Sequence, residues 1–258
     1  MIAYHLRLFG LLAALLACTT GQAAAAQQAA PLQQIRLNLS GSLGDFYLLY
    51  GVDNDPAHLA AAQRRGSQID SLLGQLAAPN DSAGLPVLEQ LRRQWPAYRT
   101  LLLELTNSLQ QRQTPSGGAI AELLRQHRHL TQLGETLSGY YPTPASPLAG
   151  QSQALAMQLQ TLNSDYLAHS VGANVLGGDK EPLDMQTRAF SQGLQQLQQT
   201  RPGGEAQRLL QKIERKWRYI EPSLRHYQQD NIPSLVNRYS SRIIEDLALL
   251  PSLAQAAQ

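Results

Sequence analysis

Two Arg-x-Trp pairs carry the side chains best suited to hold a ligand, Arg93 with Trp95 and Arg215 with Trp217. A guanidinium and an indole can enclose a ligand through cation–π and stacking contacts. Residues two apart on an α-helix, however, point to different sides of it. We therefore favour an interpretation in which each Trp packs in the core and each Arg faces solvent or a neighbouring helix. A ligand cleft is the alternative.

The sequence has none of the common catalytic or metal-binding motifs: no G-x-S-x-G, no H-E-x-x-H, no G-x-x-x-x-G-K-[ST] and no Glu-x-x-His pair. His127 and His129 are two residues apart, so they do not share a helix face. His127 is in register with Leu123 and Leu130, which favours a structural histidine over a metal ligand. We expect a protein that is not an enzyme and that uses no metal and no cofactor.

Leu, Trp and Tyr residues spaced by three and four predict amphipathic helices, most clearly over residues 85–109. Strand-forming residues are scarce, and loops containing Gly, Pro, Asn or Asp separate the helical segments. The net charge of +2 excludes a strongly basic protein, so we expect no nucleic-acid partner. Eight helices are predicted, over 32–50, 57–76, 85–109, 120–140, 152–169, 183–199, 210–227 and 232–250.

The two halves of the chain repeat each other. At an offset of 122 residues Arg93 and Trp95 fall on Arg215 and Trp217, and at 120 Asp45 falls on Asp165. Short connections favour antiparallel neighbouring helices. We therefore predict an all-α protein of two tandem up-down-up-down four-helix bundles, over 30–142 and 146–258, with a Pro-rich boundary at 141–147. A single array of eight helices with coincidental phasing is the alternative.

The N-terminus predicts export. Residues 1–26 have the charge, the apolar run and the small-residue cleavage site, Ala24-x-Ala26, of a secretory signal. Leu15-Leu16-Ala17-Cys18 also resembles a bacterial lipobox, which would make 1–17 the signal and Cys18 the lipidated N-terminus. We expect a periplasmic protein, with lipid anchoring in the outer membrane through Cys18 as the alternative. No other segment is apolar over the length that spans a bilayer.

A short motif follows in the first predicted helix, Asn38-Leu39-Ser40-Gly41-Ser42-Leu43. It resembles the start of the first-helix motif in two related sensor families, the N-terminal domain of type IV pili methyl-accepting chemotaxis transducers and the periplasmic domain of nitrate/nitrite sensors. The resemblance implies extracytoplasmic four-helix bundles and makes Asn38, Ser40 and Gly41 candidate ligand-binding residues. Small residues there also have a simpler explanation, close helix packing.

The motif departs from those families after Leu43. The next residues, from Gly44 to Leu49, include no arginine, whereas an arginine carries the anion contact in the nitrate sensors. Asp45 would repel an anion. Nitrate binding is therefore not implied.

From these features we expect an exported, non-catalytic sensor-like module. It would bind a protein partner, such as a membrane sensor or a pilus component, or a small ligand. The alternative is a lipoprotein that acts as an envelope scaffold or spacer. Because no membrane-spanning segment follows the bundles, we expect any signal to require a partner.

Overall fold

The computed structural model describes residues 29–144, 146–173, 182–229 and 231–255. These residues form eight α-helices and a 3₁₀ turn, Ser82–Gly84, and they contain no strand. The all-α prediction and its eight helices are confirmed. The predicted signal segment and Cys18 lie outside the described residues. The helices are the N-terminal helix (29–51), α2 (Pro56–Gln75), α3 (Leu85–Gln110), α4 (Gly117–Ser138), α5 (Pro147–Ser170), α6 (Leu183–Gln199), α7 (Gly204–Arg225) and α8 (Pro233–Gln255).

Most helix ends lie within three residues of the predicted ones, with three exceptions. Helix α7 begins at Gly204, six residues before the predicted start at 210, directly after the Pro-Gly pair of the preceding loop. Helix α5 begins at Pro147, five residues before the predicted start, because proline is well suited to the first turn of a helix. Helix α8 continues through Pro251 to Gln255, whereas the predicted helix ends at residue 250. Proline removes one backbone donor there, and the turn continues without it.

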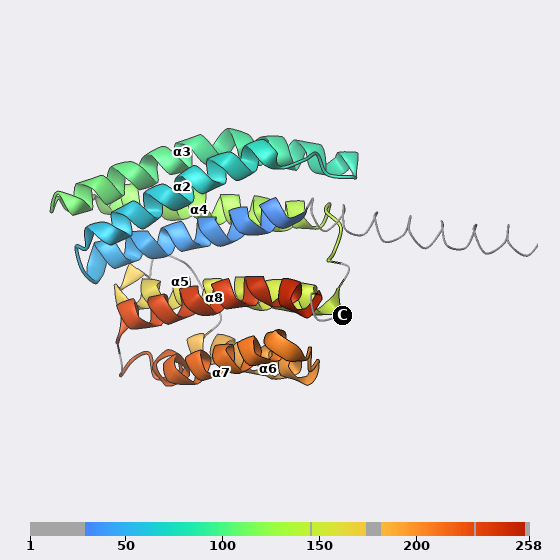
Figure 1. Cartoon of the computed structure of the whole chain (residues 1–258). Coiled ribbons are helices and arrows are strands. Elements are labelled where there is room, and N and C mark those ends of the chain that lie inside the picture. The colour runs from blue at the N-terminus through green and yellow to red at the C-terminus, as the bar shows by residue number, and fades with distance from the viewer. Residues whose placement is uncertain (1–28, 145, 174–181, 230, 256–258) are drawn as a thin grey trace, which may run out of the picture.

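The first four helices form one bundle. Ile35 and Leu39 of the N-terminal helix meet side chains of α2, α3 and α4 around a small internal gap. The other residues that surround this gap are Ile69, Leu73, Leu91, Trp95 and Leu130. Figure 1 shows these four helices as the upper layer of the molecule. The apolar side chains that the sequence spaces by three and four thus pack together in one shared interior.

The second four helices form the other layer (Figure 1). Helix α5 packs against α6 and α8, and α7 packs against α6 and α8. Each helix therefore contacts its sequence neighbour, as short connections require. Its buried apolar residues join those of the first bundle in one continuous core.

The N-terminal helix and α5 lie side by side at the centre and run parallel. Gln33 Nε2 donates to the Gln153 carbonyl at 3.2 Å, and Ser164 Oγ donates to the Ser40 carbonyl at 3.0 Å. These contacts join residues 120 and 124 apart, so both helices advance in the same direction. Every residue from Leu37 to Leu49 is buried. A helix buried on all sides is a core element, and here it is packed by both bundles.

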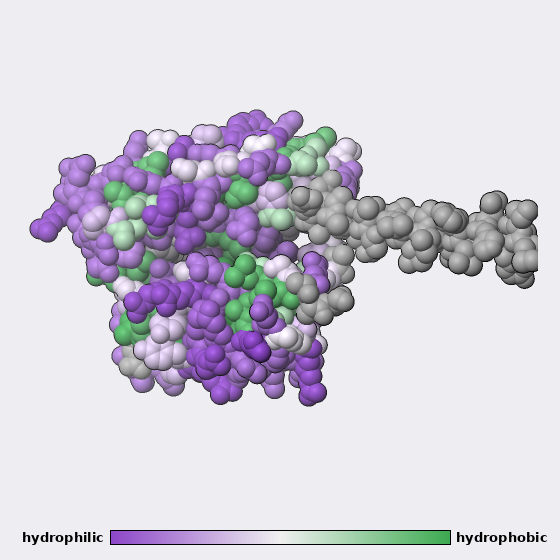
Figure 2. Space-filling model, viewed as in Figure 1, coloured by the Kyte–Doolittle hydropathy of each residue, from purple (hydrophilic) through white to green (hydrophobic). Residues whose placement is uncertain are grey.

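The surface agrees with this arrangement. Figure 2 shows that the side on which α2 and α8 face the viewer is mostly hydrophilic, with separate apolar areas. Within the described ranges, no helix combines the length and the apolar character needed to cross a bilayer.

Candidate functional site

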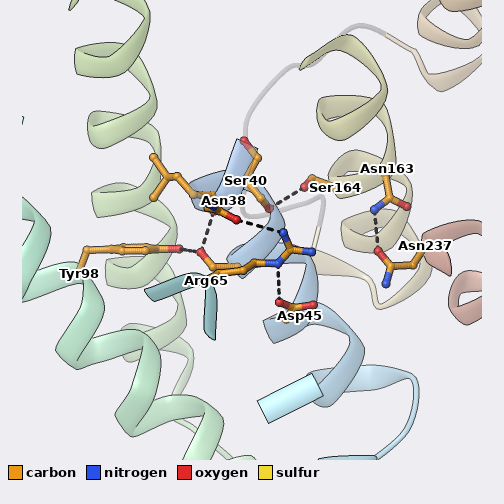
Figure 3. A network of polar contacts seen from close by, with 10 residues as sticks. Asn38, Ser40, Asp45, Arg65, Tyr98, Asn163, Ser164 and Asn237 are labelled. Carbon is orange, nitrogen blue, oxygen red and sulfur yellow. Dashed lines mark hydrogen bonds and ion pairs between the residues drawn. The ribbon is translucent and has the colours of Figure 1, made fainter. Parts of the chain in front are cut away.

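The sequence motif on the N-terminal helix surrounds an arginine from α2. Arg65 Nε donates to Asp45 Oδ2 at 3.0 Å, and its Nη1 donates to Asn38 Oδ1 at 3.5 Å (Figure 3). A Cβ added to Gly41 would lie 2.6 Å from the Arg65 Cζ. Positions 38, 41 and 45 share one helix face, because they are spaced by three and four. The Arg65 guanidinium therefore lies against Asn38, Gly41 and Asp45, and we call these three residues the seat of Arg65.

The Asp45 side chain is 4 % exposed, whereas the Arg65 side chain is 27 % exposed. Burial raises the pKa of Asp45, and Arg65, His58 and Arg64 act in the opposite direction. From the sequence, residues 44–49 contain no arginine, and Asp45 is expected to repel an anion. The structure adds a partner from the neighbouring helix, because Arg65 of α2 pairs with the Asp45 carboxylate.

More polar contacts extend along the N-terminal helix on either side of this pair. Ser42 Oγ donates to the Leu39 carbonyl at 2.7 Å and lies 3.3 Å from the Tyr98 hydroxyl. That hydroxyl lies 3.2 Å from His127 Nδ1. His127 is thus part of a structural hydrogen-bond chain, as its register predicted. We call Asn38, Ser40, Ser42 and Asp45, with the side chains bonded to them, the polar seam.

The polar seam also joins the two bundles. The carbonyl of Ser40 accepts the bond from Ser164 of α5 (Figure 3). Beside it, within the second bundle, Asn163 Nδ2 of α5 donates to Asn237 Oδ1 of α8 at 2.8 Å. Ser40 thus contributes its backbone to the contact between the bundles. Gly44 permits this close approach of the two helices, since a Cβ added to it would lie 3.3 Å from Leu167 Cδ1 of α5.

Equivalent contacts recur in the second bundle. Asp165 accepts from Gln186 Nε2 at 3.1 Å, at offsets of 120 and 121 from Asp45 and Arg65. These repeated contacts favour a duplication over coincidental phasing. The charged version of the contact is in the first bundle, since the partner in the second is a glutamine.

The tryptophans repeat in the same way. Trp95 Nε1 donates to Asp70 Oδ1 at 2.7 Å, and Trp217 Nε1 donates to Ser191 Oγ at 3.0 Å. Trp95 is 4 % exposed and Trp217 is 3 % exposed, so both belong to the core. The predicted packing of the tryptophans is therefore confirmed.

Arg93 and Arg215 are exposed on α3 and α7. Arg93 lines a hollow between α3 and α4 with Gln94 and Arg125. The structure thus brings Asn38, Ser40 and Gly41 together on one helix but does not bring the two Arg-x-Trp arginines to them.

A cleft of about 370 Å³ opens beside the polar seam, where the two bundles meet. We call it the inter-bundle cleft. Asn38 and Arg65 line it on the side of the first bundle. Its other lining residues are Gln34 and Leu37 of the N-terminal helix, Ala61, Arg64 and Gln68 of α2, Gln160 of α5, and Ser241, Ile244, Glu245 and Ala248 of α8.

Gln160 is the most informative of these side chains. Gln160 is 5 % exposed, and its amide is not among the fully buried polar atoms that lack a hydrogen-bond partner. Its polar atoms therefore reach the space of the cleft that they line. From there the amide can form hydrogen bonds to a molecule held in the cleft.

Sequence reasoning identified Asn38 and Gly41 but missed Arg65, Gln160 and Glu245. One signal for Arg65 was present, because it lies among the apolar and small positions Ala62, Gly66 and Ile69 on the buried face of α2. A charged residue in that register indicates a buried partner. No comparable signal marks Glu245, which is one of many charged residues on exposed helix faces.

The arrangement shows no metal centre: within the part of the chain that is described, no group of three or more His, Cys, Asp or Glu side chains could hold a metal ion. Comparison with protein family models, with curated proteins and with solved structures gave no significant match.

Replacing Gly41 with Ala tests the seat of Arg65. Ala normally stabilises a helix relative to Gly by about 1 kcal/mol. At Gly41 the new methyl group would displace the Arg65 guanidinium from Asp45, so we expect a net loss of about 1–2 kcal/mol in urea unfolding. Gly74→Ala on α2 is the control, because nothing lies within 4 Å of its added Cβ. An equal gain from both substitutions would contradict the assignment.

Proposed function

We propose that this protein is an exported, non-catalytic, sensor-like module that binds a small ligand in the inter-bundle cleft. The observation that carries the proposal is a cleft lined by polar side chains from both bundles, among them the amide of Gln160 of α5. A volume of about 370 Å³ is within the range of small-molecule sites. The motif that resembles sensor families lies at the same place.

The position of the cleft supports a signalling role. The N-terminal helix and α2 line one side, and α5 and α8 line the other. A ligand that contacts both sides stabilises one relative position of the two bundles over others. That change would be passed on by an envelope partner such as a membrane sensor or a component of a type IV pilus or chemosensory system. Periplasmic export, through the predicted signal at residues 1–26, is part of the proposal.

The lipobox-like segment supports a second arrangement, in which Cys18 carries a lipid and the module is held at the outer membrane. Mass spectrometry of the mature N-terminus separates the two. An acylated Cys18 would establish the anchored form, and a start at Gln27 would establish the free periplasmic form.

Ligand binding can be tested by thermal unfolding in a broad panel of small organic acids, amines, amino acids and inorganic anions. A ligand that binds only the folded state raises the unfolding temperature. We expect at least one compound to do so in the wild-type protein, and we expect Gln160→Leu to abolish the increase. Arg93→Gln, outside the cleft, should retain it. No increase with any compound, or the same increase in Gln160→Leu, would contradict the proposal.

A further inference from the structure

The inter-bundle cleft has opposite charges on its two sides. Arg64 comes from α2 and Glu245 comes from α8, and both side chains are exposed where they line it. With respect to described partners, neither makes a hydrogen bond or an ion pair, so the two do not pair with each other. An open guanidinium and an open carboxylate thus border the same space.

Arg65, the other arginine of the cleft, is already paired within the protein. Its guanidinium is held by Asp45 and Asn38, and its charge is balanced by the buried carboxylate. The charge of Arg64 contributes only the smallest of the influences that lower the pKa of Asp45. The charge that the cleft can offer to a ligand is therefore one positive group on the first bundle and one negative group on the second.

This pattern selects among small molecules. A simple anion would be attracted by Arg64 but repelled by Glu245. A simple amine would be attracted by Glu245 but repelled by Arg64. A molecule with a carboxylate at one position and an ammonium group at another satisfies both. The amides of Gln34, Gln68 and Gln160 can bond to the polar groups between, and Leu37 and Ile244 provide an apolar surface for an aliphatic portion.

Given the proposed function, on which this inference rests, we propose that the ligand is a small zwitterion of the amino-acid class. Its carboxylate lies against Arg64 and its ammonium group lies against Glu245. It contacts both bundles at once, since each charged end is held by a different bundle. The amide of Gln160 completes the site from α5.

Calorimetric titration of the full mature protein with the twenty common amino acids, one at a time, is the first step of the test. The best binder is then compared with two matched analogues, the acid that lacks its amino group and the amine that lacks its carboxylate. We expect each analogue to bind at least about tenfold more weakly, because a hydrogen bond to a charged group contributes about 1.5–3 kcal/mol.

Two variants test the assignment of each end. Arg64→Gln should weaken the amino acid at least about tenfold and leave the affinity for the amine analogue nearly unchanged. Glu245→Gln should weaken the amino acid similarly and leave the acid analogue nearly unchanged. Both positions are exposed, so the folded state should survive, and Arg93→Gln and Arg215→Gln are matched surface controls.

The outcomes separate this inference from the proposed function. If the acid analogue or an inorganic anion binds as tightly as any amino acid, and Glu245→Gln has no effect, the zwitterion is wrong while ligand binding in the cleft stands. If no compound of any class binds, both are wrong. Tight binding of an amino acid that is insensitive to both variants would place the ligand elsewhere and would also overturn the inference.

Discussion

Arg65→Gln is expected to lower the free energy of unfolding by about 3 kcal/mol at pH 7, since removing one member of a buried ion pair leaves the other charge without compensation. Asp45 is the deeply buried member, and Arg65 reaches the cleft. The substitution therefore leaves the charge that is more costly to bury. The second bundle shows that glutamine fits sterically, because Gln186 bonds to Asp165 in the equivalent place. Asp165 is only half-buried, so its carboxylate remains partly hydrated.

The cost of Arg65→Gln should depend on pH. Burial already raises the pKa of Asp45 in the folded protein, and loss of Arg65 removes the largest influence that lowers it. A carboxyl whose folded pKa is above its unfolded value destabilises the fold above that folded pKa, and the penalty disappears as pH falls below the unfolded value. The difference in stability between wild type and variant should therefore be largest near pH 7 and smaller near pH 4.

Urea unfolding at both pH values measures this effect. The double variant Asp45→Asn/Arg65→Gln should regain most of the stability at pH 7, because no buried charge remains. Arg93→Gln on exposed α3 should change stability by less than about 0.5 kcal/mol. A loss in Arg65→Gln that is equal at both pH values, or that persists in the double variant, would show that the pair is not the source.

The helices were predictable because their information is local. The spacing of Leu, Trp and Tyr fixes which face of each helix is buried, and breaker residues fix the ends. The same logic put Trp95 and Trp217 in the core and left Arg93 and Arg215 on the surface. Every one of these inferences uses residues within a few turns of one another.

The site was only partly predictable because its contacts are long-range. Asn38 and Gly41 belong to a recognisable local motif, but their partner Arg65 is on another helix, 27 residues from Asn38. The inter-bundle cleft depends on a further step, the parallel packing of the N-terminal helix with α5. Hydrophobic periodicity says which face is buried but not which helix covers it. Gln160 and Glu245 could therefore not be assigned from sequence.

Phe46→Ala should cost about 4 kcal/mol, the middle of the range for truncating a buried phenylalanine. Phe46 is fully buried in the N-terminal helix and stacks on Tyr50, with ring centroids 5.7 Å apart. Because both bundles pack on this helix, the loss should spread through the continuous core. Leu249→Ala is the control, since this leucine is 55 % exposed and alanine favours the helix.

The two tryptophans allow each bundle to be followed separately in this experiment. The chain has one Trp in α3 of the first bundle and one in α7 of the second. In a Trp217→Phe background fluorescence reports the first bundle, and in a Trp95→Phe background it reports the second. If the N-terminal helix belongs to one cooperative unit, Phe46→Ala shifts both transitions to lower urea by the same amount. A shift confined to the Trp95 signal would instead mean that the bundles unfold independently, and it would weaken the argument that a ligand between them could couple their positions.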